Sequence, residues 1–186
     1  MKRILAGQSA IYNQFHGSSA FSVISQRGDD YAAYYTAMYL IQDTGEAVDR
    51  HLASDFSSDP LTAYLEFWGV MQAIFIQQDA ISELHRVIVG SAPPITSNSA
   101  WSKLRDKRNV CAGHPANRDR GVPASQRSFM GRSFGNYTHV TYELWDDATE
   151  TTTHPSFNLQ KMIDDYDKEA SDLLKIVLAT MKTKWP

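Results

Sequence analysis

The chain has 186 residues, of which 42% are hydrophobic and 21% charged, and its formal net charge is −3. This composition is typical of one soluble globular domain and excludes disordered, fibrous and membrane-embedded chains. Cys111 is the single cysteine, which excludes an intramolecular disulfide, and no apolar stretch reaches the roughly 20 residues that span a bilayer. The basic start at Lys2 is not followed by the apolar core of a signal peptide, so we expect a cytoplasmic protein without a membrane segment.

Charge is distributed unevenly along the chain. Residues 101–132 contain eight basic and two acidic side chains, a net charge of +6, whereas the rest of the chain carries −9. A basic segment in an acidic protein predicts a local anionic partner. An ordinary solvated loop is the alternative, and composition favours neither.

The N-terminal region predicts one long helix after an irregular start. Apolar residues within 1–28 are unevenly spaced, and only a short helix around Ile11 is indicated. Asp29 is a candidate cap for a helix over about 31–51, which carries one apolar stripe at helical spacing.

A second long helix is predicted over 61–89. Asp59 followed by Pro60 is a favoured way to open a helix. The segment is apolar around much of its circumference, which predicts a central and buried position. Gln78 and Asp79 therefore require partners, because an unpaired buried polar or charged group is costly.

A third helix is predicted over about 99–112. Its apolar row contains Leu104 and Cys111, and Arg108 falls in the same row, so this arginine is expected to point inward. Gly113 fits the left-handed position that follows a helix end. We interpret the cysteine as a small core residue and not as a nucleophile.

The C-terminal part predicts a loop, a β-hairpin and a helix. Residues 116–137 are rich in Arg, Gly, Ser and Asn and indicate a long surface loop. Alternation over 138–145 and β-branched residues over 149–153 predict the hairpin. A last amphipathic helix is expected over 159–182. The four main helices predict a mainly α protein.

The stretch from Leu104 to Pro115 concentrates the candidate chemistry. It reads Leu-Arg-Asp-Lys-Arg-Asn-Val-Cys-Ala-Gly-His-Pro, with five residues between Arg108 and His114 and with Asn109 directly after the arginine. This pattern resembles the Arg-(four to six residues)-His motif of the HEPN superfamily, in its Arg-Asn…Gly-His-Pro form. The resemblance implies a single four-helix up-and-down domain over 1–186, with about 116–156 as an inserted loop and β-hairpin.

The motif residues suit RNA cleavage without a metal, in which the 2′-hydroxyl attacks the adjacent phosphate. His114 would act as general acid/base, because histidine as a residue type exchanges protons near physiological pH. Arg108 would stabilise the charged transition state, and Asn109 would hold the phosphate or orient the histidine. A plain helix stop with a histidine at the negative end of the dipole is the alternative. The histidines show no metal-ligand spacing, so neither metal nor cofactor is expected.

The resemblance implies a homodimer in which two motifs face one shared cleft. Asp79 would pair with Arg108 and fix its guanidinium, and Gln78 would support the site from the same helix. Basic residues around the motif would guide single-stranded RNA by charge. These residues are Arg105, Lys107, Arg118 and Arg120.

Two functions of different classes follow from this interpretation. The first is a metal-independent endoribonuclease, such as a toxin or abortive-infection effector controlled by an antitoxin or another regulatory protein. The second is a catalytically silent HEPN-like dimeric module that binds a protein partner or a nucleotide. Accessibility separates them: His114 opening onto a cleft with Arg108 favours the enzyme, and His114 walled in by Trp101 or Trp145 favours the silent module.

Overall fold

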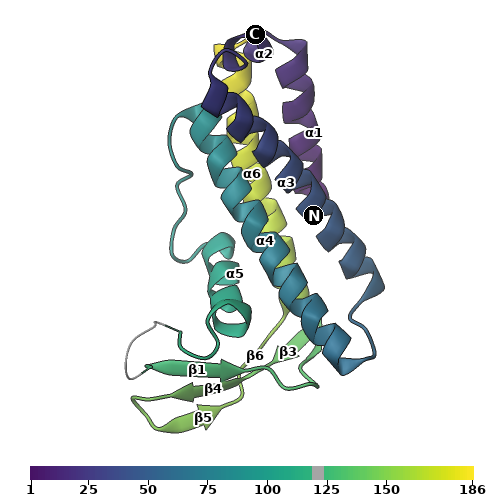
Figure 1. Ribbon diagram of the computed structural model, residues 1–186, viewed down its shortest axis with the longest axis vertical. Helices are drawn as coiled ribbons and strands as arrows, with labels where there is room; N and C mark the ends of the chain where they lie inside the picture. The colour runs from purple at the N-terminus through teal and green to yellow at the C-terminus, as the bar shows by residue number, and fades with distance from the viewer. Residues whose placement is uncertain (119–123) are drawn as a thin grey trace.

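The computed structural model describes residues 1–118 and 124–186 and is mainly helical, as predicted (Figure 1). The helices of the described part are α1 (Lys2–Gly17), α2 (Ala20–Ile24), α3 (Gly28–Ser54), α4 (Pro60–Val89), α5 (Ala100–Arg108) and α6 (Leu159–Lys184). A π-helical turn, η1 (Asn109–Gly113), continues α5 directly. No helix in this part of the chain combines the length and hydrophobicity needed to cross a membrane.

The four long helices α1, α3, α4 and α6 lie side by side along the long axis of the molecule (Figure 1). Contacts join α1 to α3, α3 to α4, α4 to α6, and α6 back to α1. Large side chains fill the space between these helices and are fully buried. Among them are Ile4, Ile11, Phe15, Tyr34, Phe67 and Tyr166.

Helix α1 corrects the prediction for the N-terminal region, where only a short helix near Ile11 was indicated. Its buried residues are Ile4, Gln8, Ile11 and Phe15, which recur at helical spacing. Gln8 donates a hydrogen bond to the Met38 carbonyl of α3 at 3.4 Å. Because a polar residue occupies one position of the buried row, the apolar residues alone do not show the helical periodicity of α1.

Local signals determine the bounds of α4 but not the start of α3. The Asp59 carboxylate accepts a hydrogen bond from the Thr62 N–H at 2.8 Å, and Gly90 ends α4 in the left-handed region with φ 93°. Both observations confirm the prediction for this helix. Helix α3 begins at Gly28, so Asp29 lies in its first turn and is not the cap. A carboxylate there stabilises the helix through its dipole instead.

The strands form two small antiparallel sheets at one end of the long helices (Figure 1). Their order is β1-β4-β5 in one sheet and β2-β3-β6 in the other. Their bounds are β1 Gln126–Phe129, β2 Gly135–Asn136, β3 His139–Thr141, β4 Glu143–Asp146, β5 Thr151–Thr153 and β6 Ser156–Phe157.

The predicted hairpin is present as β4 and β5, with Leu144 opposite Thr153. Two corrections accompany it. The single strand expected over 138–145 is interrupted at Tyr142, and its halves β3 and β4 belong to different sheets. The loop expected over 116–137 contains β1 and β2, because β1 is held by backbone pairing with β4 and its polar sequence shows no apolar alternation.

Helix α5 is shorter than the third helix predicted and is fixed against both α4 and α6. Gln78 of α4 is fully buried and donates to the Trp101 carbonyl at 3.0 Å. The Ala100 N–H donates to the Glu169 carboxylate of α6 at 2.6 Å. The Trp101 ring packs edge-on against Tyr166, with 5.7 Å between ring centroids. These contacts hold the segment that carries Arg108 and His114.

Candidate active site

The motif lies where the α-helical backbone of α5 changes to a π-helical turn. The His114 N–H donates to the Asn109 carbonyl at 2.8 Å, five residues back along the chain. Such turns are rare in proteins overall, but those that occur often lie at functional sites. Gly113 belongs to this turn and does not adopt positive φ, which corrects the left-handed conformation predicted for it.

The Arg108 guanidinium is directed at α4, in agreement with the predicted inward orientation. Its Nη2 donates to Gln72 Oε1 at 2.8 Å, and its Nη1 donates to Asn109 Oδ1 at 3.1 Å. The Cζ atom lies 4.2 Å from the centroid of the Phe75 ring. Both acceptors are neutral amides, and no carboxylate of the described residues forms an ion pair with Arg108. The positive charge is therefore positioned by neutral groups and without a direct ion pair.

Burial changes the protonation energetics of two groups in the motif. Burial lowers the pKa of the Arg108 guanidinium and the charge of neighbouring Arg105 lowers it further, while the Asp79 carboxylate offsets part of this decrease. An arginine stays protonated even so, and an anion bound beside it would relieve this penalty. Burial raises the pKa of the Cys111 thiol to about 12, which agrees with a core residue and not with a nucleophile.

Gly113 permits the close approach of the arginine. A Cβ atom at this position would lie 2.5 Å from Arg108 Nη1 and 3.4 Å from Asn109 Oδ1. The first distance is shorter than any van der Waals contact allows. A side chain here would therefore displace the guanidinium, so glycine is favoured by the space that Arg108 occupies and not by backbone conformation.

Asp79 pairs with Arg105, which corrects the predicted pair between Asp79 and Arg108. Arg105 Nη1 lies 3.0 Å from Asp79 Oδ1, and its Cζ lies 4.2 Å from the Phe75 centroid. The reason is helix direction. Along α4 the order is Gln72, Phe75, Asp79, whereas on α5 the matching contacts come from Arg108 first and Arg105 second. The two helices therefore run in opposite senses at this contact, and the amide meets Arg108.

His114 is half-buried and follows the π turn directly, at the edge of the β1-β4-β5 sheet. The Ser128 N–H of β1 donates to the Pro115 carbonyl at 2.8 Å, and the Ser128 hydroxyl donates to the Val110 carbonyl. The exposure of the His114 side chain is thus intermediate. The side chain is neither fully open, as the enzyme predicts, nor fully enclosed, as the silent module predicts. The Trp145 ring, one of the two candidate walls, lies against the Arg127 guanidinium.

The basic residues predicted to guide RNA are largely engaged with protein groups. Lys107 Nζ donates to the Tyr142 hydroxyl at 3.1 Å, and Arg118 Nη2 lies 2.7 Å from Asp106 Oδ1. Arg120 lies outside the described residues. Ion pairs at a protein surface contribute about 1 kcal/mol or less, so a phosphate can displace them.

Phe75 is a site residue that sequence reasoning missed, and Gln72 stood out as a polar residue of its helix but was not assigned to the site. Both lie in the stripe of α4 that begins at Leu61, Leu65 and Trp68, with Gln72 exposed and Phe75 half-buried. A glutamine inside an otherwise apolar stripe was the available signal, because it requires a polar partner. Which residue supplies that partner depends on how α5 crosses α4.

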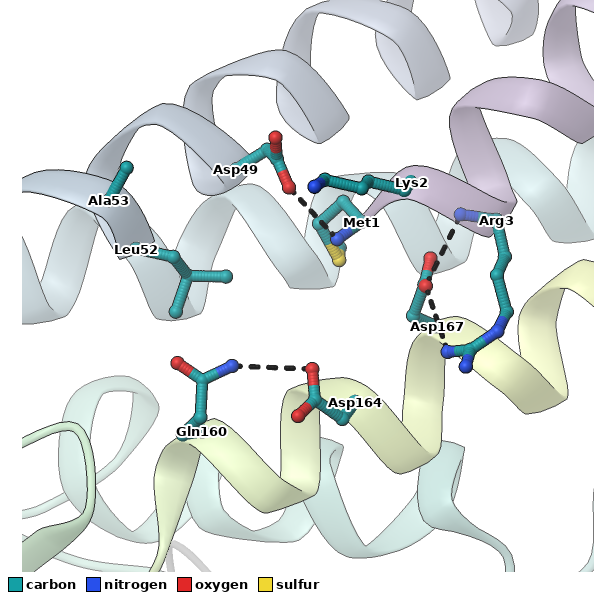
Figure 2. Close-up of a pocket in the computed structure, with 9 residues that line it drawn as sticks. All are labelled: Met1, Lys2, Arg3, Asp49, Leu52, Ala53, Gln160, Asp164 and Asp167. Atoms are coloured by element: carbon teal, nitrogen blue, oxygen red, sulfur yellow. Dashed lines mark hydrogen bonds and ion pairs between the residues drawn. The ribbon is translucent and has the colours of Figure 1, made fainter.

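A separate cavity of about 540 Å³ lies where the start of α1 meets α3 and α6 (Figure 2). Buried Asp167 accepts hydrogen bonds from the N–H groups of Arg3 and Ile4, and Asp49 pairs with the Met1 amino group at 3.3 Å. These carboxylates stabilise the N-terminus of α1 through its unpaired N–H groups and dipole. The cavity shares no lining residue with the motif. No cluster suited to a metal ion occurs within 1–118 and 124–186.

Comparisons with family models, curated proteins and solved structures found no match for this chain. The function is therefore inferred from the geometry and chemistry of the site.

Proposed function

We propose that the protein is a metal-independent endoribonuclease of the HEPN type, built on a four-helix up-and-down bundle and acting in the cytoplasm. One observation carries the proposal. The Arg108 guanidinium is held by two neutral amides and an aromatic ring, and a single π turn separates it from His114. A cation that is fixed, half-buried and without a direct ion pair suits a phosphate that gains negative charge in the transition state.

The reaction joins the 2′-oxygen of RNA to the adjacent phosphorus and breaks the bond from phosphorus to the 5′-oxygen. The proton of the 2′-hydroxyl passes to a base, and the leaving 5′-oxygen takes a proton from an acid. His114 serves in these transfers, because imidazole exchanges protons near neutral pH. Arg108 donates to a non-bridging phosphate oxygen through the terminal N–H groups that its two amide acceptors leave over.

Asn109 acts as a positioning residue in this proposal. Its side-chain oxygen accepts from Arg108 Nη1, and its carbonyl accepts the His114 N–H. One residue therefore fixes the guanidinium and the backbone from which the imidazole projects. Each chain supplies one motif histidine, whereas the reaction needs a base and an acid. A homodimer with two motifs at one cleft supplies both. A toxin or abortive-infection effector held in check by an antitoxin fits this activity.

A catalytically silent HEPN-like module is the second candidate. The observation that favours it is the pairing of basic residues with carboxylates, Arg105 with Asp79 and Arg118 with Asp106. A basic surface already compensated in this way suits a protein partner or a single nucleotide as well as an RNA strand.

Cleavage of mixed single-stranded RNA in EDTA separates the two candidates. The wild type is compared with His114→Ala and Arg108→Ala, and Asp106→Asn serves as a control that removes a charge outside the motif. The enzyme predicts cleavage by the wild type and by the control, with loss in both motif variants. A folded, dimeric wild type that leaves RNA intact while binding a nucleotide supports the silent module.

A further inference from the structure

A second cavity, of about 570 Å³, opens between α4 and β1 and is lined mainly by apolar side chains. The fractions of side chain exposed are 66% for Leu65, 61% for Phe129 and 38% for Trp68. Apolar groups that remain this exposed together indicate a binding surface. A volume of this size accommodates a ligand as large as a nucleotide.

The cavity adjoins the motif on two sides. Trp68 lies one helical turn before Gln72, the residue that holds Arg108, which is about 6 Å along the helix axis. Phe129 follows Ser128, whose backbone and hydroxyl bond to the motif segment at Pro115 and Val110. The cavity and the motif segment are therefore both held by α4 and β1.

The lining fits a flat aromatic ligand with an anionic neighbour. Trp68 is held edge-on by Tyr64, with 4.6 Å between ring centroids and an interplanar angle of 80°. Phe129 presents an exposed ring, and exposed Arg132 contributes a cation to the same lining. Unpaired bases bind proteins by stacking on aromatic side chains next to basic groups.

We propose that this cavity binds an unpaired base of single-stranded RNA, stacked on Phe129 and Trp68, while an adjacent phosphate meets Arg108. The inference rests on the proposed RNA substrate and adds a base subsite that the motif does not contain. Stacking tolerates every base, so the site selects single-stranded over paired RNA rather than a sequence.

Binding of an uncleavable 2′-O-methyl oligonucleotide tests the inference, with an abasic oligonucleotide of equal length and charge beside it. Phe129→Ala is compared with Tyr39→Ala, a control on α3 whose side chain is 63% exposed, close to the 61% of Phe129. Trp68→Ala is the second cavity variant. We expect both cavity variants to bind the base-containing strand about tenfold more weakly, the loss expected for one stacking contact. The control keeps wild-type affinity, and the abasic strand binds all four proteins equally.

Two outcomes overturn the inference. The first is unchanged base-dependent binding in both cavity variants. The second is a cavity variant that turns a dimer into a monomer in sedimentation while base-dependent binding persists, because a second copy then occupies the cavity. Cleavage measured in parallel distinguishes failure of the proposed base subsite from failure of the proposed ribonuclease activity. Cleavage that Arg108→Ala abolishes, with normal base-dependent binding by both Phe129→Ala and Trp68→Ala, refutes the base subsite alone. Base-dependent binding lost in Phe129→Ala, without cleavage by the wild type, supports the subsite and refutes the ribonuclease.

Discussion

A methyl group added at position 113 tests whether activity depends on where the Arg108 guanidinium lies, and not only on the presence of an arginine. In Gly113→Ala the new Cβ would lie 2.5 Å from Arg108 Nη1 and 3.1 Å from Cζ. The guanidinium must therefore move by about 1 Å, since carbon and nitrogen do not approach below about 3.5 Å without repulsion. The Arg108 side chain is flexible and half-buried, so it moves towards solvent while the backbone stays in place.

The expected costs differ for stability and for activity. Displacement loses the hydrogen bonds to Asn109 and Gln72, about 1 kcal/mol each. Replacing a helical glycine by alanine returns roughly 0.5–1 kcal/mol. Unfolding free energy should thus fall by only about 1 kcal/mol. Misplacing a catalytic cation by about 1 Å lowers the rate about 100-fold.

Urea unfolding and RNA cleavage in EDTA, measured on the same preparations, check both values. Gly69→Ala is the matched control, because a Cβ at this helical position on α4 meets nothing within 4 Å. It should match or exceed wild-type stability and cleave normally. Wild-type cleavage by Gly113→Ala, while Arg108→Ala is inactive, would refute the reasoning that the glycine positions the arginine.

Three further predictions concern groups outside the reaction itself. Gln78→Ala should lower unfolding free energy by about 2–4 kcal/mol, because a buried amide and its bond to the Trp101 carbonyl are lost; an unchanged urea midpoint contradicts this. Burial raises the pKa of Cys111 to about 12, so a thiol reagent at pH 8 should label it slowly in the native protein and rapidly in urea. Hydrogen bonds from Thr62 hold the pKa of Asp59 below its ordinary value of 3.8, so its stabilisation is complete above that pH and is lost as pH falls through the lower, folded-state pKa. In acid titrations followed by circular dichroism, Asp59→Asn should lose less stability over that range than the wild type, and equal losses would exclude this contribution.

Local sequence signals predicted some elements because those elements begin and end locally. The bounds of α4 follow from a capping aspartate, a proline and a glycine that satisfy or avoid backbone groups within one turn. Helix α1 was missed because Gln8 occupies its buried row and bonds to another helix. Strand β1 depends on backbone pairing with β4 and with the segment around Pro115, which no pattern within Gln126–Phe129 reveals.

The sequence predicted the residues of the site that lie close along the chain, but not the partners that packing of other helices supplies. The motif identified Arg108, Asn109 and His114, and the π turn η1 connects them along the chain. The partners on α4 depend on the direction in which α5 crosses it, and this direction assigns Gln72 to Arg108 and Asp79 to Arg105. The π turn is a shift of backbone hydrogen bonding by one residue, which residue periodicity does not encode.

The ends of the cleavage products test the central claim most directly. Single-stranded RNA incubated with the wild type in EDTA should yield fragments with 2′,3′-cyclic phosphate and 5′-hydroxyl ends, identified by mass spectrometry. The same incubation with His114→Ala should yield none, because the proton transfers then lack their imidazole. Fragments with 5′-phosphate ends, or cleavage that persists without His114, would contradict a metal-independent attack by the 2′-hydroxyl.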